Sequence, residues 1–138
     1  MNIDEATELF FSRHWVRSAI GSEPPRWVEW KSFLFGPVPN HDKAGCYALF
    51  RNTELVYVGL GASKGSGIYT EHGLATRLMK NVLCKDWSKE GDWAKLNPKW
   101  DYITSLRTIG FAADTAYLAA SLESFLIRQL RPPENKKV

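Results

Sequence analysis

Two apolar runs with a short polar turn between them constrain the fold of this chain more than any other sequence feature. Residues 46–50 and 55–60 consist mainly of aliphatic and aromatic side chains, and residues 51–54 are turn-prone. Two short apolar runs joined in this way are typical of a β-hairpin. We therefore expect this hairpin to be the best-defined local element of the fold.

The hairpin would bring two tyrosines together. A three-residue loop at 51–53 would place Tyr47 opposite Tyr57 and Gly45 opposite Gly59. Cross-strand tyrosines can serve sheet stability alone, and that interpretation stays open. Two facing glycines, however, leave the backbone open to the close approach of a ligand. This combination favours a functional role for the tyrosine pair.

The other elements predict helices around a small sheet. We expect a helix over 4–20 with Asp4 as its N-cap, a helix over 74–84, a strand over 102–109, and a final helix from Asp114 to Leu130. The order helix, strand, strand, helix, strand, helix predicts an α+β fold with an antiparallel sheet covered by helices. Residues 1–40 form an N-terminal helical extension packed on the core, and residues 41–138 form the main domain.

Composition excludes several classes of protein. The 138 residues are 44% hydrophobic and 24% charged, which is typical of a globular domain. No apolar run is long enough to span a bilayer and the first residues are acidic, so we expect no membrane association and a cytoplasmic location. Cys46 and Cys84 are far apart and are expected to be reduced thiols, without a disulfide or zinc site. The net charge of +3 is compatible with a polyanionic partner.

Glu123 falls within the apolar sector of the predicted final helix. A buried carboxylate must be paired, protonated or bound to a cation, because burying an unpaired charge is costly. One interpretation is an ion pair with an arginine such as Arg77. The other is coordination of a hard cation such as Mg²⁺.

Arg77 borders the apolar half of its predicted helix, and Asn81 follows one turn later. Their side chains should project together beside the surface that packs on the sheet. A guanidinium can grip a phosphate through two parallel hydrogen bonds, although it can also simply extend along a helix interface. Arg77 is therefore a candidate phosphate ligand.

Five sequence pieces together resemble the GIY-YIG nuclease family. They extend over about residues 45–135, so the first 40 residues lie outside the match. The five pieces are Gly45-Cys46-Tyr47, Tyr57-Val58-Gly59, Arg77 within Leu74-Ala75-Thr76-Arg77-Leu78, Glu123 within Leu122-Glu123-Ser124-Phe125-Leu126-Ile127, and Pro132-Pro133-Glu134-Asn135. Each piece is common alone, but their order and spacing make the similarity specific.

The resemblance implies a three-stranded antiparallel sheet with flanking helices, and hydrolysis of DNA phosphodiester bonds with one divalent metal, Mg²⁺ or Mn²⁺. By this similarity Glu123 would hold the metal and Arg77 would stabilise charge on the phosphate. Tyr47 would activate or orient the attacking water, Tyr57 would assist, and Asn135 would brace the site. A tyrosine needs a nearby cation for this role because its ordinary pKa is near 10.

The chain departs from the family pattern at two motif positions. Cys46 replaces the usual isoleucine, and Asn81 stands where the family often has histidine or tyrosine. The second change affects proton transfer. His72, Lys64 or Lys80 could supply that function, and the alternative for each is a solvated polar side chain.

Tryptophans and lysines alternate in the segment between the second helix and the third strand. Such a segment can stack on bases and contact phosphates, although a lysine-decorated packed surface is an equal alternative. The candidate nucleic-acid contacts are Lys80, Lys85, Lys89, Lys95 and Lys99. No organic cofactor is expected, because Gly59 and Gly61 are followed by Lys64 where a dinucleotide motif needs its third glycine.

Three hypotheses follow. The first is a metal-dependent DNA endonuclease acting through Tyr47, Tyr57, Arg77 and Glu123. The second is a catalytically inactive module on the same fold that binds nucleic acid or protein, and the third is a structural core with coincidental motifs. A dimer or a partner subunit could supply specificity, because a small domain has little surface for recognising a long site.

Overall fold

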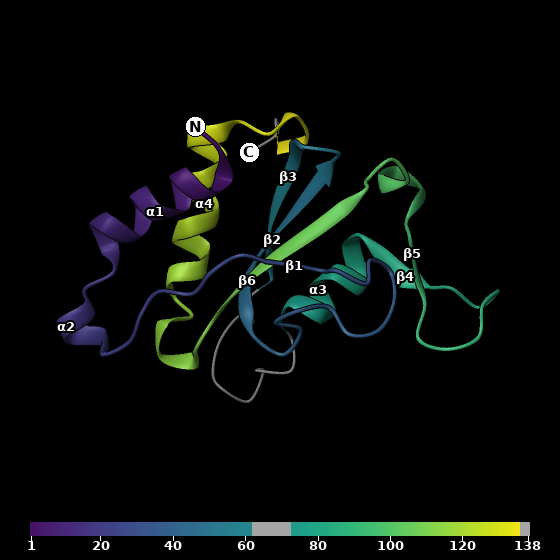
Figure 1. Cartoon of the computed structure of the whole chain (residues 1–138), viewed down its shortest axis with the longest axis horizontal. Coiled ribbons are helices and arrows are strands. Elements are labelled where there is room, and N and C mark those ends of the chain that lie inside the picture. Colours follow the sequence, from purple (N-terminus) through teal and green to yellow (C-terminus); the bar gives the residue numbers. More distant parts are fainter. Residues whose placement is uncertain (62–72, 136–138) are drawn as a thin grey trace.

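A four-stranded antiparallel sheet lies at the centre of the molecule in our computed structural model, which describes residues 1–61 and 73–135 (Figure 1). The strand order is β1 (Val28–Glu29), β6 (Ser105–Phe111), β2 (Ala44–Arg51) and β3 (Glu54–Gly61). The predicted α+β class is confirmed. The sheet has one strand more than expected, because β1 pairs with β6. A two-residue strand is too short to show an alternating pattern in the sequence.

The β2–β3 hairpin forms as predicted, but with a different register. Its strands close at Arg51 and Glu54, so the turn has two residues, and Asn52 adopts a left-handed φ of 56°. Because of this turn and a register shift between Leu49 and Phe50, Tyr47 pairs with Gly59 rather than with Tyr57. The expected direct pairing of the two tyrosines is therefore wrong.

The paired glycines are also displaced from the predicted register. Gly45 faces Gly61 in β3 and Gly110 in β6, not Gly59. A Cβ on Gly45 would lie 1.9 Å from the carbonyl oxygen of Ile109, so this glycine allows two strands to approach closely. Its role is sheet packing rather than access for a ligand.

A β-bulge determines the direction of the Tyr57 side chain. The register changes between Leu49 and Phe50, and Val56 is the extra residue on the opposite strand. Without this residue, alternation from the two-residue turn would direct Tyr57 to the sheet face opposite Tyr47. With it, both tyrosines lie on one face, as the sequence predicted.

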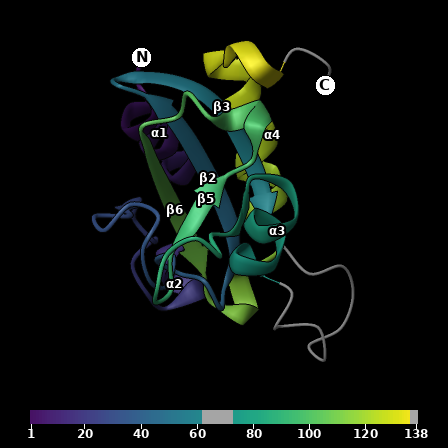
Figure 2. The same cartoon turned by 90° about the vertical axis from the view of Figure 1, so that its right-hand side faces the viewer.

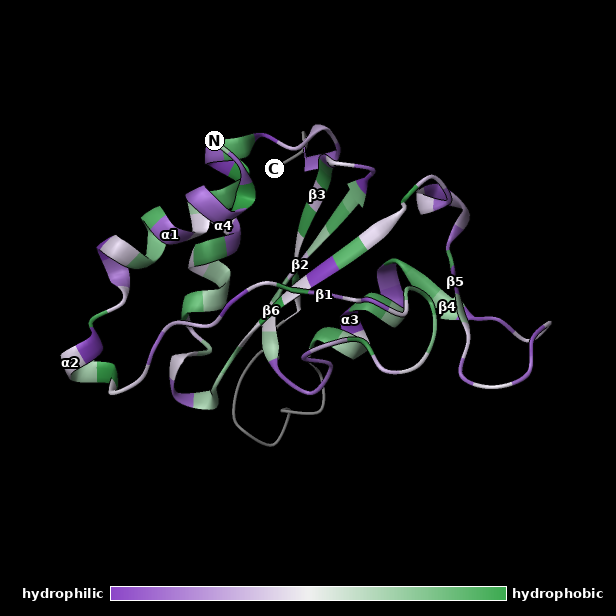
Figure 3. Ribbon diagram, in the orientation of Figure 1, coloured by the Kyte–Doolittle hydropathy of each residue, from purple (hydrophilic) through white to green (hydrophobic). Residues whose placement is uncertain are grey.

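Helices cover both faces of the sheet. Helices α1 (Ile3–His14) and α4 (Leu118–Leu130) cover one face, and α3 (Leu74–Asn81) covers the other with the hairpin β4 (Leu83–Lys85) and β5 (Ala94–Leu96). Figure 2 separates α1 from α3 across the strands. Strands β2 and β3 are largely hydrophobic, whereas the loop between β4 and β5 is hydrophilic (Figure 3). This pattern agrees with a sheet buried on both faces.

The N-terminal helix is interrupted. Asn2, not Asp4, is the N-cap of α1 and forms a capping box with Glu5. The chain becomes extended after His14, where the Trp15 indole donates to Ser22 O at 2.8 Å, and a short helix α2 (Arg17–Ile20) follows. The predicted single helix over 4–20 is therefore wrong. α1 packs on α4 and joins the same core cluster.

Tertiary packing also shortens two other predicted helices. α3 ends at Asn81, since the fully buried Leu83 pairs with Leu96 in the β4–β5 hairpin. α4 begins at Leu118 without a side-chain cap, and Asp114 instead lies in the 3₁₀ turn η3 (Ala113–Thr115). Two more 3₁₀ turns are η2 (Pro98–Trp100) and η4 (Pro133–Asn135).

The described helices include none of the length and hydrophobicity that crossing a membrane requires. Cys46 and Cys84 are both free, as expected.

Candidate functional site

Side chains from four elements are brought together at β3, an edge strand of the sheet. Tyr47 of β2 extends over Gly59 of β3, where a Cβ would lie only 2.2 Å from the Tyr47 Cζ. Tyr57 is next to it on the same face. Arg77 comes from α3 on that face and Glu123 from α4 on the other, and both charges affect the pKa values of both tyrosines. The four predicted residues therefore form one electrostatically coupled group.

The two phenols have unequal environments. Their ring centroids are 6.1 Å apart, but Tyr47 is only 2% exposed whereas Tyr57 is half-buried. Burial is the largest cause that raises the pKa of Tyr47, followed by the charge of Tyr57 and a hydrogen bond to it. The same interaction between the two phenols lowers the pKa of Tyr57.

Tyr57 is therefore the phenol that is easier to deprotonate. Burial and the charge of Glu123 still raise its pKa above 10, while the Tyr47 hydrogen bond and the charge of Arg77 lower it. Tyr57 is also the more accessible of the two to a substrate. The geometry assigns the substrate-facing position to Tyr57 and the supporting position to Tyr47.

Glu123 is half-buried, as the helical pattern predicted. Burial raises the pKa of its carboxyl group, and the charge of Arg77 opposes this shift. Among the salt bridges of residues 1–61 and 73–135, none joins Glu123 to Arg77. The carboxylate therefore interacts with the arginine at longer range and keeps its oxygens available.

Glu123 fits a magnesium ion that retains most of its water. The described part of the chain contains no group of three or more His, Cys, Asp or Glu that could hold a metal. Mg²⁺ nevertheless often binds through one or two carboxylates, with water and substrate phosphate as further ligands. An available carboxylate beside an arginine is compatible with this mode.

Asn135 is held against the backbone of β3. Its Nδ2 donates to Val58 O and its Oδ1 accepts from Val58 N, both at 2.9 Å, and the side chain is 7% exposed. These two bonds occupy the free edge of β3 next to Tyr57. Asn135 therefore braces the strand, and its contacts are those of a positioning residue.

Two of the residues considered for proton transfer fall in the described part of the chain. Asn81 and Lys80 are exposed on the last turn of α3. Lys64 and His72 lie outside the residues that the structure describes. Their roles stay predictions.

Of the five candidate nucleic-acid lysines, Lys80 lies on α3, and the other four lie on the β4–β5 hairpin and the segment after it. Lys85 donates to Gly91 O at 2.6 Å, and three acidic residues, Asp86, Glu90 and Asp92, alternate with the lysines of its loop. Two other lysines lie over tryptophan rings, Lys89 over Trp93 at 4.7 Å and Lys99 over Trp100 at 5.1 Å, and Lys95 is exposed on β5. This mixture of charges makes the surface less basic than its lysines alone suggest.

The contact of Trp100 with Tyr57 was not predicted from the sequence. The Trp100 ring centroid is 5.1 Å from that of Tyr57, and the Trp100 side chain is 3% exposed. Nothing in the local pattern marks this tryptophan, because its contact with Tyr57 depends on the path of the whole segment after α3.

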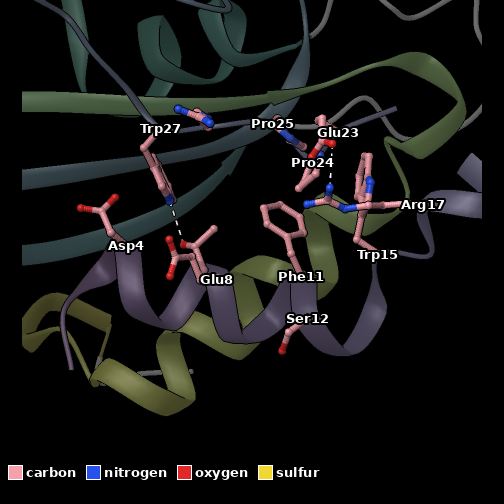
Figure 4. Close-up of a pocket in the computed structure, with 12 residues that line it drawn as sticks. Asp4, Glu8, Phe11, Ser12, Trp15, Arg17, Glu23, Pro24, Pro25 and Trp27 are labelled. Carbon is pink, nitrogen blue, oxygen red and sulfur yellow. Dashed lines mark hydrogen bonds and ion pairs between the residues drawn. The ribbon is translucent and has the colours of Figure 1, made fainter. Parts of the chain in front are cut away.

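A groove of about 770 Å³ lies elsewhere, between α1 and the segment before β1 (Figure 4). None of the predicted site residues lines it. Two pairs of polar groups are joined within the groove: Trp27 Nε1 donates to Thr7 Oγ1 at 2.8 Å, and Arg17 and Glu23 are 2.6 Å apart. Its aromatic walls come from Phe11, Trp15 and Trp27.

Comparisons of the chain with protein-family models, with curated proteins and with solved structures found no match.

Proposed function

We propose that this chain is a GIY-YIG-type, divalent-metal-dependent endonuclease that hydrolyses phosphodiester bonds of DNA. The observation that carries the proposal is the convergence of four residues at the edge of the sheet. The charge of Arg77 lowers the pKa values of Tyr47, Tyr57 and Glu123, although these residues lie far apart in the sequence. Phosphate hydrolysis needs a positioned nucleophile and compensation of the developing negative charge, which a phenol, an arginine and a metal-binding carboxylate can supply together.

The phenols would handle the proton of the attacking water. In this proposal Tyr57 reacts as its phenolate and becomes the neutral phenol by accepting that proton, since it is the more accessible of the two phenols. Tyr47 packs against Tyr57, and the charge of Arg77 favours the Tyr57 phenolate that must be present before the water attacks. The pKa of an ordinary phenol is near 10, so this assistance is needed at neutral pH.

Arg77 has a second role toward the substrate. A guanidinium can bind two phosphate oxygens at once and compensate the negative charge that develops on them. Glu123 would hold Mg²⁺ or Mn²⁺, which would supply Lewis-acid stabilisation of the same phosphate. Asn135 would keep β3 and therefore Tyr57 in position through its bonds to Val58.

Nicking of supercoiled plasmid with Mg²⁺ or Mn²⁺ tests this proposal. The comparison is wild type against Arg77→Ala and Glu123→Ala, with Arg17→Ala and Glu23→Ala as matched controls from the groove. We expect each site variant to lose about 10²–10³-fold in nicking rate, the range for removal of one transition-state contact, and the controls to cleave like the wild type.

Equal cleavage by all five proteins would show that the assigned site is wrong. A wild type that binds DNA without nicking it would favour the catalytically inactive binding module instead. Gel shift of the same plasmid, cut to linear fragments, distinguishes these two outcomes.

A further inference from the structure

We propose that Trp100 is a positioning residue for the phenol of Tyr57. Trp100 lies outside all five sequence pieces that support the nuclease proposal. The inference rests on that proposed function for its effect on cleavage, but not for its effect on Tyr57 itself.

Tyr57 is enclosed between two aromatic neighbours. The Tyr47 ring centroid is 6.1 Å away and the Trp100 centroid 5.1 Å away, with the Trp100 ring tilted by 53°. Aromatic pairs at such distances prefer tilted or offset arrangements, so the contact restricts the orientation of the tyrosine ring. Tyr47 bounds one side of the phenol and Trp100 another.

The β-bulge makes this restraint necessary. Tyr57 follows the extra residue Val56, at the point where the regular ladder between β2 and β3 is interrupted. Backbone pairing therefore defines the direction of the side chain less strictly here than in a regular strand. Packing against a buried ring can supply the missing restraint.

Trp100 is itself held firmly. Its backbone N–H donates to Asn97 O at 2.7 Å and its carbonyl accepts from Ile103 N at 3.0 Å. Asn97 N in turn donates to Val82 O at 2.8 Å, at the end of α3. The segment between α3 and β6 thus connects the indole to the helix that carries Arg77. The same part of the chain, α3 and the segment that follows it, therefore positions both Arg77 and Tyr57.

Substitution of Trp100 tests the proposal with a matched control. Trp100→Leu removes the ring and Trp100→Phe keeps an aromatic contact. Trp30 belongs to the same core cluster and is 4% exposed, but its ring contact is with Phe33. Trp30→Leu therefore removes a comparable buried indole without touching Tyr57.

Two measurements are made on each folded variant. Steady-state nicking at several DNA concentrations gives kcat and KM, and NMR of ¹³Cζ-labelled tyrosine follows the ionisation of Tyr57. We expect Trp100→Leu to lower kcat at least about tenfold at a similar KM, because a misplaced catalytic group can cost up to about a hundredfold. The pKa of Tyr57 should fall toward 10, because burial is the largest cause of its shift.

Trp100→Phe should retain most of kcat, with a smaller change of the Tyr57 pKa in the same direction, and it decides the question if Trp100→Leu does not fold. An unchanged Tyr57 titration in the Trp100 variants, or an equal change in Trp30→Leu, would overturn the proposal. If the wild type does not cleave DNA, the proposed function fails, and the tyrosine titration still decides the role of Trp100.

Discussion

The edge of the sheet at β3 and the N-terminal groove both combine aromatic and charged side chains, but they use them differently. In the groove Arg17 pairs with Glu23 at 2.6 Å and Trp27 donates to Thr7 at 2.8 Å. At β3 the charges of Arg77 and Glu123 act on two tyrosines without a salt bridge between them in the described structure. A concave surface by itself therefore does not identify the functional site in this protein. The charges of Arg77 and Glu123, which no described salt bridge joins, make the edge of the sheet at β3 the better candidate site.

If this contrast is correct, substitutions at β3 should change activity and substitutions in the groove should change stability. The following predictions test it in order of expected effect.

Tyr57→Phe should reduce the nicking rate about 10²-fold, within the range for losing an acid–base group. Tyr47→Phe should cost less, about tenfold, because Tyr47 is buried and only supports the ring of Tyr57. Both variants should unfold in urea close to the wild type. A larger loss for Tyr47→Phe than for Tyr57→Phe would reverse the assigned roles.

Gly59→Ala should destabilise the fold by about 1–3 kcal/mol, the usual cost of overpacking. The new Cβ would lie 2.2 Å from the Tyr47 Cζ and must displace the ring. In a Tyr47→Leu background the same alanine should cost less. Urea unfolding of the four proteins in this cycle gives the coupling between the two positions, and additive costs would contradict the close contact.

Thr7→Val in the groove should cost about 1 kcal/mol of stability, because it removes the acceptor of the Trp27 indole. Nicking by the folded protein should be unchanged. A loss of cleavage at full folding would show that the groove takes part in catalysis and would remove the distinction between the two regions.

The smallest effect is the pH dependence of Glu123. Burial raises the pKa of this carboxyl group above its ordinary value of 4.5 in the folded protein. Its contribution to stability is therefore fully present below pH 4.5 and is lost as the pH rises through the folded pKa. In metal-free buffer the stability of Glu123→Gln should not decrease in this way. Its free energy of unfolding relative to that of the wild type should therefore increase with pH. Thermal unfolding from pH 4 to pH 8 measures the difference.

The sheet face on which the Tyr57 side chain lies was predicted correctly, although the predicted turn length and strand register were wrong. A three-residue loop without a bulge and a two-residue turn with one extra residue at Val56 give the same alternation of side chains. The alternation of side chains along a strand indicates the sheet face on which a residue lies. It does not indicate which residue pairs with it on the neighbouring strand. The sequence therefore predicted both tyrosines on one face and could not predict Gly59 as the partner of Tyr47.

The remaining errors concern features that depend on distant parts of the chain. β1 has two residues and β4 and β5 have three each, too few for a periodic pattern. The end of α3 is determined by pairing of Leu83 with Leu96, which overrides the apolar helical pattern. Glu123 could be recognised from its own helix because its burial depends on local spacing. Trp100 could not, since only the folded path brings it to Tyr57.

The most direct test of the account is the position of a divalent ion. Mn²⁺ titrated into isotope-labelled protein should broaden the NMR signals of Tyr57, Arg77 and Glu123, and leave those of Glu8 and Glu23 in the groove sharp. Glu123→Gln should abolish this broadening. Broadening confined to the groove, or equal broadening in wild type and Glu123→Gln, would contradict the assignment of the site to the edge of the sheet.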